Sequence, residues 1–390
     1  ARPASTGQWE DSPRFLHRLL DVMATGVNPV QDRMYWFLSN VLVIAQTDSV
    51  QLNDHKEHVN LLRAWSGRSY RQMLAEMVRT TGMQEYLNGV WSTPPHPNEN
   101  LARELLELFS LGVTHPTTKA ANYTETDIKE IARALTGFRF NWDTSTAYFD
   151  AAYWDAGTKT FLGAARGKAG VDEVIGALAG HASFRYYLPD RLYTELVGTK
   201  ASATVLDELA RVFGADGDVK ALVAAIARRP EFIADSALRN RVKSPVELVL
   251  SALRVLGMRD LDRLYLDWML SEMRQHPFMA PNVNGWPQGT EWFHAGHLIQ
   301  WSRFINWWTF SDDLDPALPA AHQVPTVRRL HAEGTRTTGG DLALKLAGLA
   351  QVSTPTRTAV RDYANAGEWN IYRASGTMML VLVSPEFLVN

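Results

Sequence analysis

Residues 98–115 read NENLARELLELFSLGVTH, and this stretch shows the pattern that decides the fold class. Leu101, Leu105 and Leu108 recur at the three- and four-residue spacing of an α-helix, and Gly112 follows where a helix would end. The alternation of apolar and polar residues that marks half-buried strands is scarce in the rest of the sequence. The stretch therefore predicts a helix over 99–112 in an all-α protein.

The same spacing predicts helices along almost the whole chain, and several of them begin at a capping pattern. Proline stands at the first predicted position of two helices, after Ser12 and after Ser244, and residues 124–127 form a capping-box pattern. The predicted helices cover 12–25, 29–46, 56–66, 68–80, 99–112, 125–137, 171–180, 184–197, 202–213, 218–228, 244–256, 261–274, 291–309, 340–350, 356–366 and 371–383.

Long segments rich in proline, glycine, asparagine or aromatic residues separate these helices as predicted loops: 91–98, 138–170, 276–290 and 311–326. Residues 146–150 have some strand-like character. Loops of this length inside a compact domain are often functional. We therefore expect one large multi-helix domain over 1–390 with long functional loops. The alternative is two helical lobes, 1–140 and 171–390, joined by the aromatic loop 138–170.

Composition narrows the classes of function. The chain has 390 residues, a net charge of −3 and no long basic block, so nothing in it favours a nucleic-acid partner. No uninterrupted apolar run reaches the roughly 18 residues of a membrane helix. The absence of cysteine excludes disulfides, thiolate metal sites and thiol nucleophiles. The 13 tryptophans are unusual, and flat indole faces suit sugar rings as well as protein cores.

Two glutamates in the opening stretch differ in their predicted surroundings. On a helical wheel Glu104 falls at the margin of the apolar face, whereas Glu107 points further toward solvent. A carboxylate at an apolar margin needs a partner or its pKa rises, and a raised pKa suits a general acid near neutral pH. Glu104 is therefore our candidate acid. The alternative is a structural ion pair with an arginine of a neighbouring helix, such as Arg133.

A carboxylate pair would need a second acidic residue as base or nucleophile, and four residues are candidates. They are Glu107, Asp127, Asp143 and Asp155, which lie on the same helix, on the next predicted helix or in the aromatic loop. The separation between the two carboxylates would then decide whether a glycosidase retains or inverts the anomeric configuration. Asp127 has an ordinary alternative role, because it completes the capping box of its helix.

The segment 276–308 contains five tryptophans. Its Asn-Gly-Trp-Pro turn would present Trp286 from a rigid loop for stacking on a sugar ring, with Trp292 nearby and Asn282 bonding to hydroxyls. Arg303 follows the turn and could anchor a carboxylate. The alternative is that tryptophan plugs the loop onto the helical core.

Four phrases, in order, resemble the bacterial family called domain of unknown function 1800. They are NENLARELLELFSLGV, YTETDIKEIARALTGF, DAGTKTFLG and APNVNGWPQGTEWF, and the closing SPEFLV also resembles the end of the family pattern. The resemblance covers roughly residues 30–390. It implies an all-helical protein that is often exported and often encoded beside a second exported protein. Arg103, Arg133 and Lys159 lie within these phrases, and we take them as candidate substrate-binding residues.

The chain departs from the family pattern at two histidine phrases. Residues 37–42 read FLSNVL where many members carry a phrase resembling F-W-H-N-H-F, and Trp154-Asp155-Ala156-Gly157 stands where H-D-x-G is often found. Two His-x-x-His pairs remain, His55 with His58 and His294 with His297, but two ligands are too few for a metal ion without a carboxylate from elsewhere.

These observations lead us to expect a secreted or periplasmic carbohydrate-active hydrolase with no metal and no cofactor. Its carboxylate pair would cleave a glycan, and its tryptophans would stack on the substrate. We expect no nucleic-acid partner and no membrane span, and the resemblance adds a neighbouring exported protein as a partner. Two alternatives stay open: an exported, non-catalytic helical binding or assembly module, and a metal- or cofactor-dependent enzyme that uses the histidine pairs.

Overall fold

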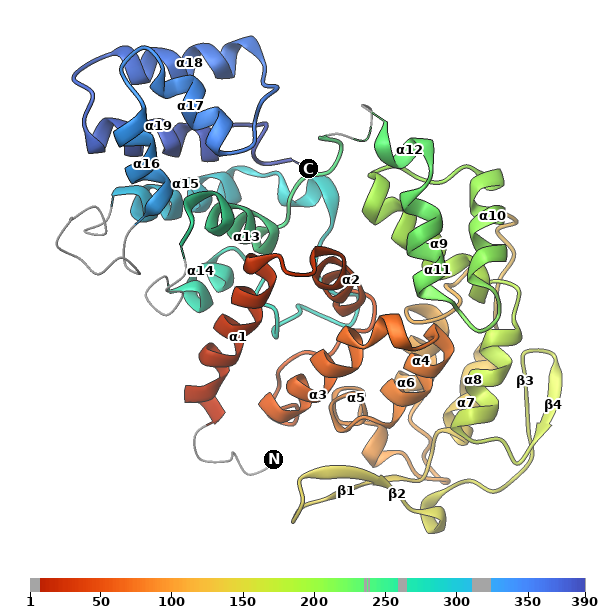
Figure 1. Cartoon of the computed structure of the whole chain (residues 1–390). Coiled ribbons are helices and arrows are strands. Elements are labelled where there is room, and N and C mark those ends of the chain that lie inside the picture. The colour runs from red at the N-terminus through yellow and green to blue at the C-terminus, as the bar shows by residue number, and fades with distance from the viewer. Residues whose placement is uncertain (1–7, 235–236, 238, 259–264, 311–323, 390) are drawn as a thin grey trace. The chain divides into compact units, whose positions relative to one another are not determined.

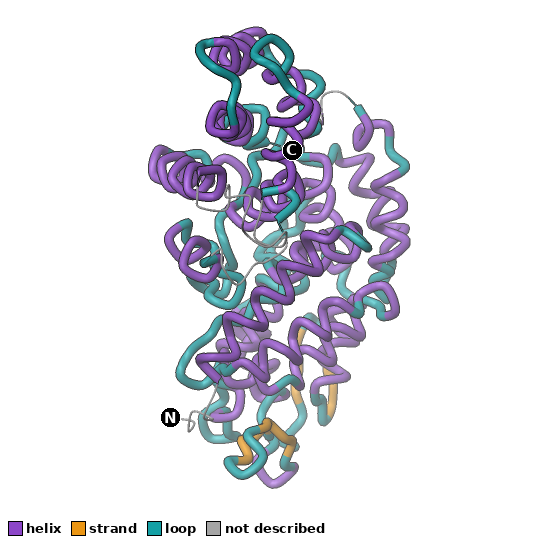
Figure 2. The backbone as a smooth tube through the Cα atoms, turned by 60° about the vertical axis from the view of Figure 1, so that its left-hand side comes forward, coloured by secondary structure: helices purple, strands orange, loops and turns teal. Residues whose placement is uncertain are grey.

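The computed structural model describes residues 8–234, 237, 239–258, 265–310 and 324–389. Helices make up most of this described chain, and its paired strands form two short hairpins (Figures 1 and 2). The predicted all-α class is therefore confirmed. The chain folds into two compact units, which we call unit 1 and unit 2.

Unit 1 contains Val30–Ala237 and Phe278–Trp286. Its helices pack in pairs, with α6 on α7, α4 on α8 and α9 on α10. Its helices are α2 (Pro29–Ser39), α3 (Leu52–Arg63), α4 (Tyr70–Arg79), α5 (Thr81–Tyr86), α6 (Glu99–Glu107), α7 (Glu125–Ala134), α8 (Val171–Gly180), α9 (Phe184–Val197), α10 (Ala203–Phe213), α11 (Val219–Ala227) and α12 (Pro230–Ile233), with short 3-10 turns η1 (Trp65–Gly67), η2 (Gly89–Trp91) and η3 (Ala151–Tyr153).

Unit 2 contains Trp9–Pro29, Leu238–Pro277 and Pro287–Asn390. Its long helix α15 packs along α19, and α16, α17 and α18 also contact α19. Its elements are α1 (Gln8–Thr25), α13 (Pro245–Leu256), α14 (Leu266–Glu272), η6 (Gly289–Trp292), α15 (Ala295–Phe310), α16 (Pro325–Glu333), α17 (Gly339–Leu346), α18 (Thr354–Asn365) and α19 (Ile371–Leu382). The expectation of one domain, or of lobes at 1–140 and 171–390, stays a prediction.

The segment 138–170 is not the single long loop that we predicted. It contains two antiparallel hairpins, β1 (Phe138–Asn141) with β2 (Thr146–Phe149) and β3 (Lys159–Phe161) with β4 (Ala164–Gly167). The strand-like character near 146–150 is confirmed by β2. The strands are only three or four residues long, which is too short for periodicity to separate them from loop.

Several predicted helix ends also differ from the structure. The helix predicted over 99–112 stops at Glu107, and the one predicted over 29–46 stops at Ser39. Pro13 lies inside α1 rather than at its first position, so this helix lacks one internal backbone hydrogen bond. The loop predicted over 311–326 lies mostly outside the described residues.

Local capping explains why α6 and α7 begin where they do. The Asn98 side chain accepts a hydrogen bond from the backbone N–H of Asn100 at 2.8 Å. At α7 the predicted capping box is confirmed, because Thr124 and Asp127 each bond the other's backbone N–H. Such caps satisfy N–H groups that have no partner within the helix.

The apolar faces of these helices form the core of unit 1. Leu101, Leu105, Ile128 and Ile131 are buried where α6 packs on α7. No helix within the described ranges combines the length and the apolar character that crossing a bilayer requires.

Candidate functional site

Glu104 lies on α6 at the edge of the buried face, as the wheel predicts, and its side chain is half-buried. Among the residues that the structure describes, none donates a hydrogen bond to its carboxylate and no cation forms an ion pair with it. Burial raises the pKa of Glu104, the neighbouring charge of Glu107 raises it further, and Arg103 offsets these effects only in part. The carboxylate is therefore disposed to hold a proton, as a general acid must.

Glu107 is less exposed to solvent than we predicted. Its side chain is half-buried, and its carboxylate accepts a hydrogen bond from the Tyr123 hydroxyl at 3.1 Å. α6 ends at Glu107, and two tyrosines reach this end of the helix: Tyr123 bonds to the Glu107 carboxylate and Tyr187 to the carbonyl oxygen of Leu108. Glu104 and Glu107 stand three residues apart, a spacing that places side chains side by side on one helix face.

Two tyrosines complete the surroundings of this carboxylate pair. Burial raises the pKa of Tyr86 on α5, and the charge of Glu104 raises it further. Burial likewise raises the pKa of Tyr123, and the charge of Glu107 and the hydrogen bond to it add to the increase. Both phenols therefore stay protonated near neutral pH and can act as hydrogen-bond donors.

Arg103, the third polar residue of the opening stretch, is occupied by other carboxylates. Its guanidinium makes two hydrogen bonds to Glu125 at 3.0 and 2.9 Å and one to Glu99 at 3.3 Å. Arg103 thus ties the first turn of α7 to α6 and makes no hydrogen bond to Glu104. Exposed pairs of this kind contribute little to stability.

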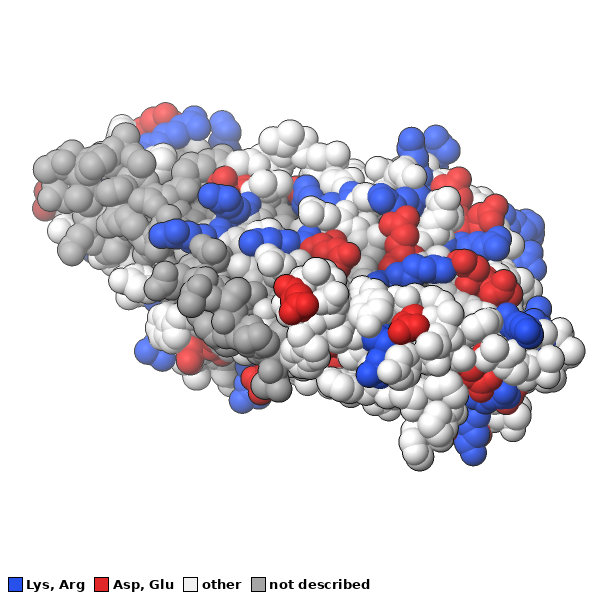
Figure 3. All heavy atoms as spheres, turned by 90° about the horizontal axis from the view of Figure 1, so that it is seen from below, with Lys and Arg blue, Asp and Glu red and all other residues white. Residues whose placement is uncertain are grey.

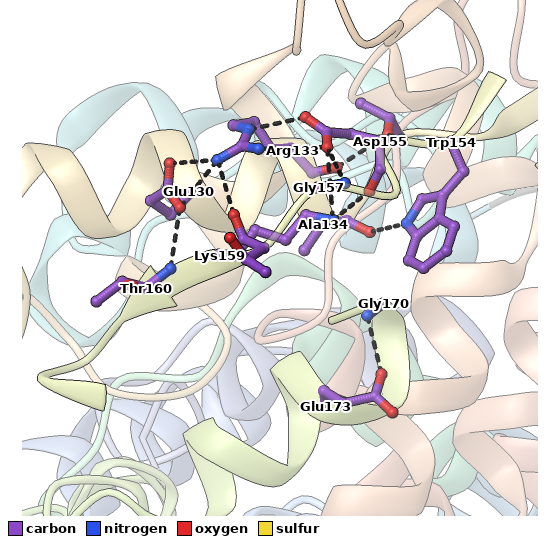
Figure 4. A network of polar contacts seen from close by, with 12 residues as sticks. Glu130, Arg133, Ala134, Trp154, Asp155, Gly157, Lys159, Thr160, Gly170 and Glu173 are labelled. Carbon is purple, nitrogen blue, oxygen red and sulfur yellow. Dashed lines mark hydrogen bonds and ion pairs between the residues drawn. The ribbon is translucent and has the colours of Figure 1, made fainter. Parts of the chain in front are cut away.

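Arg133 on α7 joins two carboxylates, and Figure 4 shows its guanidinium between them. It bonds to Asp155 through Nε at 2.7 Å and through Nη2 at 3.3 Å, and to both carboxylate oxygens of Glu130 at 2.8 and 3.1 Å. Glu130 also accepts the backbone N–H of Thr160 on β3. Arg133 therefore fastens the β3–β4 hairpin to α7 and is not the partner of Glu104.

Lys159 is almost completely buried, with 1% of its surface exposed. Its ammonium donates a hydrogen bond to the carbonyl oxygen of Asp155 and lies 4.8 Å from the centre of the Trp154 ring. Burial raises the pKa of Asp155, but the Arg133 hydrogen bonds, the Gly157 N–H and the charges of Arg133 and Lys159 lower it by more. These contacts give Lys159 and Asp155 a structural role in the hairpin.

Asp127 is likewise engaged on both carboxylate oxygens. One oxygen accepts the N–H of Thr124 at 2.7 Å in the capping box, and the other accepts the N–H of Leu162 at 2.6 Å. Leu162 stands at the turn between β3 and β4 and has a positive φ of 50°. Asp127 therefore fixes the tip of the hairpin on the start of α7.

Three predicted site residues are exposed. Asp143 stands in the turn between β1 and β2, and Asn282 accepts the N–H of Asn284 within its own loop at 2.9 Å. Arg303 is on α15 in unit 2, where it bonds to Gln300 at 3.3 Å. Neither Asp143 nor Asn282 has a contact that joins it to the carboxylate pair among the residues described.

The predicted stacking tryptophans are not presented at the surface. Trp286 is 4% exposed and stacks on Trp36 of α2 with ring centres 5.5 Å apart. The side-chain oxygen of Asn40 accepts a hydrogen bond from the backbone N–H of Trp286 at 2.7 Å. The Trp286 ring therefore anchors the loop on the helices of unit 1. Trp292, in unit 2, is 5% exposed and stacks on His297. Apolar burial explains both positions better than sugar stacking does.

The histidine pairs lie in separate units, and His294 is the exposed member among the four. His58 Nε2 donates a hydrogen bond to the carbonyl oxygen of Leu42 at 2.7 Å, and burial lowers the pKa of His58 to about 4. The rings of His294 and His297 lie 4.0 Å apart, and His297 Nδ1 bonds to the carbonyl oxygen of Trp292. Within the described part of the chain, no three side chains of His, Asp or Glu converge as metal ligands would.

Charge gives no sign of a polyanion site on the face seen in Figure 3. Basic and acidic side chains alternate there over short distances, and neither sign forms a continuous patch. This arrangement agrees with the chain's small net charge of −3.

Of the predicted residues, then, the structure brings Glu104 and Glu107 together and commits Asp127, Arg133, Asp155 and Lys159 to holding the hairpin. Sequence reasoning missed Tyr86 and Tyr123. The sequence did contain a signal for Tyr123, because this residue begins the phrase YTETD that also contains the capping box. The sequence contained no signal for Tyr86, because only packing brings this residue of α5 close to Glu104 on α6.

Comparison with known proteins identifies the family of the chain. The family model described as "Protein of unknown function (DUF1800)" matches residues 4–389, which confirms the resemblance drawn from the four phrases. No curated protein and no solved structure matches the chain.

Replacing Asp155 by alanine should lower the free energy of unfolding by about 1–3 kcal/mol, because Arg133 and Lys159 lose a part-buried partner. Because the folded-state pKa of Asp155 is lowered, its stabilisation is present above the unfolded pKa and is lost as pH falls through the folded pKa. Urea denaturation at pH 7 and pH 3 should show a smaller effect at pH 3. Asp143→Ala, in an exposed turn, is the matched control and should change stability by less than about 0.5 kcal/mol.

Glu104→Gln should raise stability at pH 7, because the substitution removes a half-buried negative charge that has no cationic partner among the described residues. A carboxylate whose folded pKa is raised destabilises progressively as pH rises from its unfolded to its folded pKa, so the gain should vanish at about pH 4. Glu130→Gln, which weakens the Arg133 pair, should instead lower stability. A loss of stability in Glu104→Gln at pH 7 would mean that Glu104 has a structural ion-pair partner.

Proposed function

We propose that this chain, which belongs to the DUF1800 family, is a glycoside hydrolase in which Glu104 is the general acid. One observation carries the proposal: Glu104 is a half-buried carboxylate with a raised pKa and, among the described residues, no hydrogen-bond donor or cation bound to it. An uncompensated carboxylate costs stability, and such costs concentrate at functional sites.

Glu107 is the second carboxylate of the proposed pair. The other candidates are less suitable, because Asp127 and Asp155 are held by hydrogen bonds in the hairpin and Asp143 stands in an exposed turn. The Tyr123 hydroxyl orients Glu107 at 3.1 Å without neutralising its charge. Glu107 can therefore stabilise the positive charge that develops on the anomeric carbon.

The proposed reaction consumes one water molecule. Glu104 donates its proton to the bridging oxygen as the bond from that oxygen to the anomeric carbon breaks. A water oxygen then bonds to the anomeric carbon, and one of the water protons passes to Glu104, which restores the acid. A secreted or periplasmic location is part of this proposal.

A non-catalytic binding or assembly module is the second candidate function. It is favoured by the burial of Trp286 and Trp292, which leaves the predicted stacking residues unavailable to a substrate. The structural use of Arg133 agrees with it as well. It gives no reason, however, for the cost of the uncompensated Glu104.

The test is hydrolysis of a panel of neutral polysaccharides and oligosaccharides by the full chain, followed as release of reducing ends. Wild type should cleave at least one glycan, and Glu104→Gln should reduce kcat by about 10²–10⁴-fold, the usual contribution of general acid–base catalysis. Wild-type activity should fall as pH rises above the raised pKa of Glu104, because the acid loses its proton.

Glu99→Gln is the matched control, since Glu99 lies on the same helix but is paired with Arg103 and is partly exposed to solvent. Its kcat should equal that of wild type. Full activity in Glu104→Gln would remove Glu104 as the acid. Failure to cleave any glycan in the panel would favour the binding module instead.

A further inference from the structure

A cavity of about 650 Å³ opens in unit 1 beside the β1–β2 hairpin. Its walls come from β2, from the Trp154 segment that follows η3, and from the start of α8 near Gly170. This volume falls within the roughly 300–1,000 Å³ of small-ligand sites. None of the residues that we predicted for the site lines this cavity.

Aromatic rings form one side of the cavity and are open to solvent. Phe149 lines the cavity from β2 and is 52% exposed, and Trp154 lines it from the segment that follows η3. Exposed apolar side chains gathered in one place commonly mark binding sites. The cavity therefore presents flat apolar faces to whatever enters it.

The orientation of these rings is fixed by contacts behind them. The indole N–H of Trp154 donates a hydrogen bond to the carbonyl oxygen of Ala134 at 3.2 Å, as Figure 4 shows. Phe149 meets Trp154 edge-on, with ring centres 6.3 Å apart and planes at 63°. Gly137 is required at the base, because its φ is +97° and a Cβ there would lie 2.6 Å from Phe149. The ring faces are thus pre-set before a ligand binds.

Charged side chains form the rim, and their signs balance. Arg79 pairs with Asp172 at 2.8 Å. Glu173 accepts the N–H of Gly170 at 2.8 Å, and Figure 4 draws this bond. Lys168 also lines the cavity. Two basic and two acidic groups offer hydrogen bonds of both kinds but no net attraction for an ion, so the rim favours a neutral ligand that carries hydrogen-bonding groups.

We propose that this cavity binds a neutral oligosaccharide through Phe149 and Trp154. A pyranose ring has apolar C–H faces and hydroxyls around its edge, which match flat rings on one side and a polar rim on the other. The choice of ligand class rests on the proposed glycosidase function. The site itself does not depend on Glu104, which does not line the cavity.

The test is isothermal titration calorimetry of the full chain carrying Glu104→Gln, so that no probe is hydrolysed. The probes are the neutral hexasaccharides of β-1,4-glucose, α-1,4-glucose, β-1,4-mannose and β-1,4-xylose, with a hexagalacturonate and an unfolded, carboxymethylated protein as contrasts. At least one neutral hexasaccharide should bind, and Phe149→Leu should raise its Kd at least tenfold. Leucine keeps an apolar side chain but lacks the flat face.

Trp142→Ala is the matched control, because Trp142 lies on the same hairpin and is 50% exposed but does not line the cavity. It should leave the Kd unchanged. Trp154→Leu should weaken binding as Phe149→Leu does, and thermal unfolding should show that each variant is folded. Binding that is equal in all variants, or binding of only the uronate or only the unfolded protein, would overturn the proposed site.

The two proposals fail in different ways. If wild type cleaves glycans and Glu104→Gln does not, while Phe149→Leu binds as tightly as its parent, the cavity proposal fails and the hydrolase stands. If Phe149→Leu and Trp154→Leu lose binding while Glu104→Gln retains full cleavage, the cavity stands and the acid is wrong. If no neutral hexasaccharide binds, the cavity proposal fails regardless of the cleavage result.

Discussion

The guanidinium of Arg133 is at the centre of the polar network that holds the β3–β4 hairpin in unit 1. By binding Glu130 and Asp155 together, it fastens the β3–β4 hairpin to α7, and Asp127 secures the tip of the same hairpin. Hydrogen-bond donors surround these carboxylates, and those around Asp155 lower its pKa. Glu104 lies outside this network and has no such support from the described residues, so the acids differ in their environment rather than in residue type.

Features that depend on local sequence could be predicted. The apolar spacing around Leu101 and Leu105 indicated the buried face of α6, and the Thr124–Asp127 capping box indicated the start of α7. The wheel also placed Glu104 correctly at the edge of the apolar face. Each of these depends on groups within one or two turns of helix, so the pattern in the sequence contains the physical cause.

Features that depend on distant packing could not be predicted. Glu107 is half-buried because α6 ends early and Tyr123 reaches its carboxylate. Trp286 is buried because Trp36 and Asn40, some 250 residues earlier, receive it. An Asn-Gly-Trp-Pro turn has the same sequence whether its indole faces solvent or a helix, and only the partner across the fold distinguishes them. The aromatic composition of the β1–β2 hairpin could be seen in the sequence, but its strands were too short to show the two-residue alternation of a strand.

The division into units has a consequence for how the chain is made. Unit 2 takes α1 from residues 9–29 and the rest of its core from beyond residue 238, with most of unit 1 between them. During synthesis, Leu16, Leu20 and Met23 of α1 emerge about 200 residues before the rest of their unit. At roughly 5–20 residues per second, that delay lasts on the order of 10–40 s. For that time α1 lacks its partners within unit 2, among them Arg254 of α13, which bonds to the carbonyl oxygens of Met23 and Ala24.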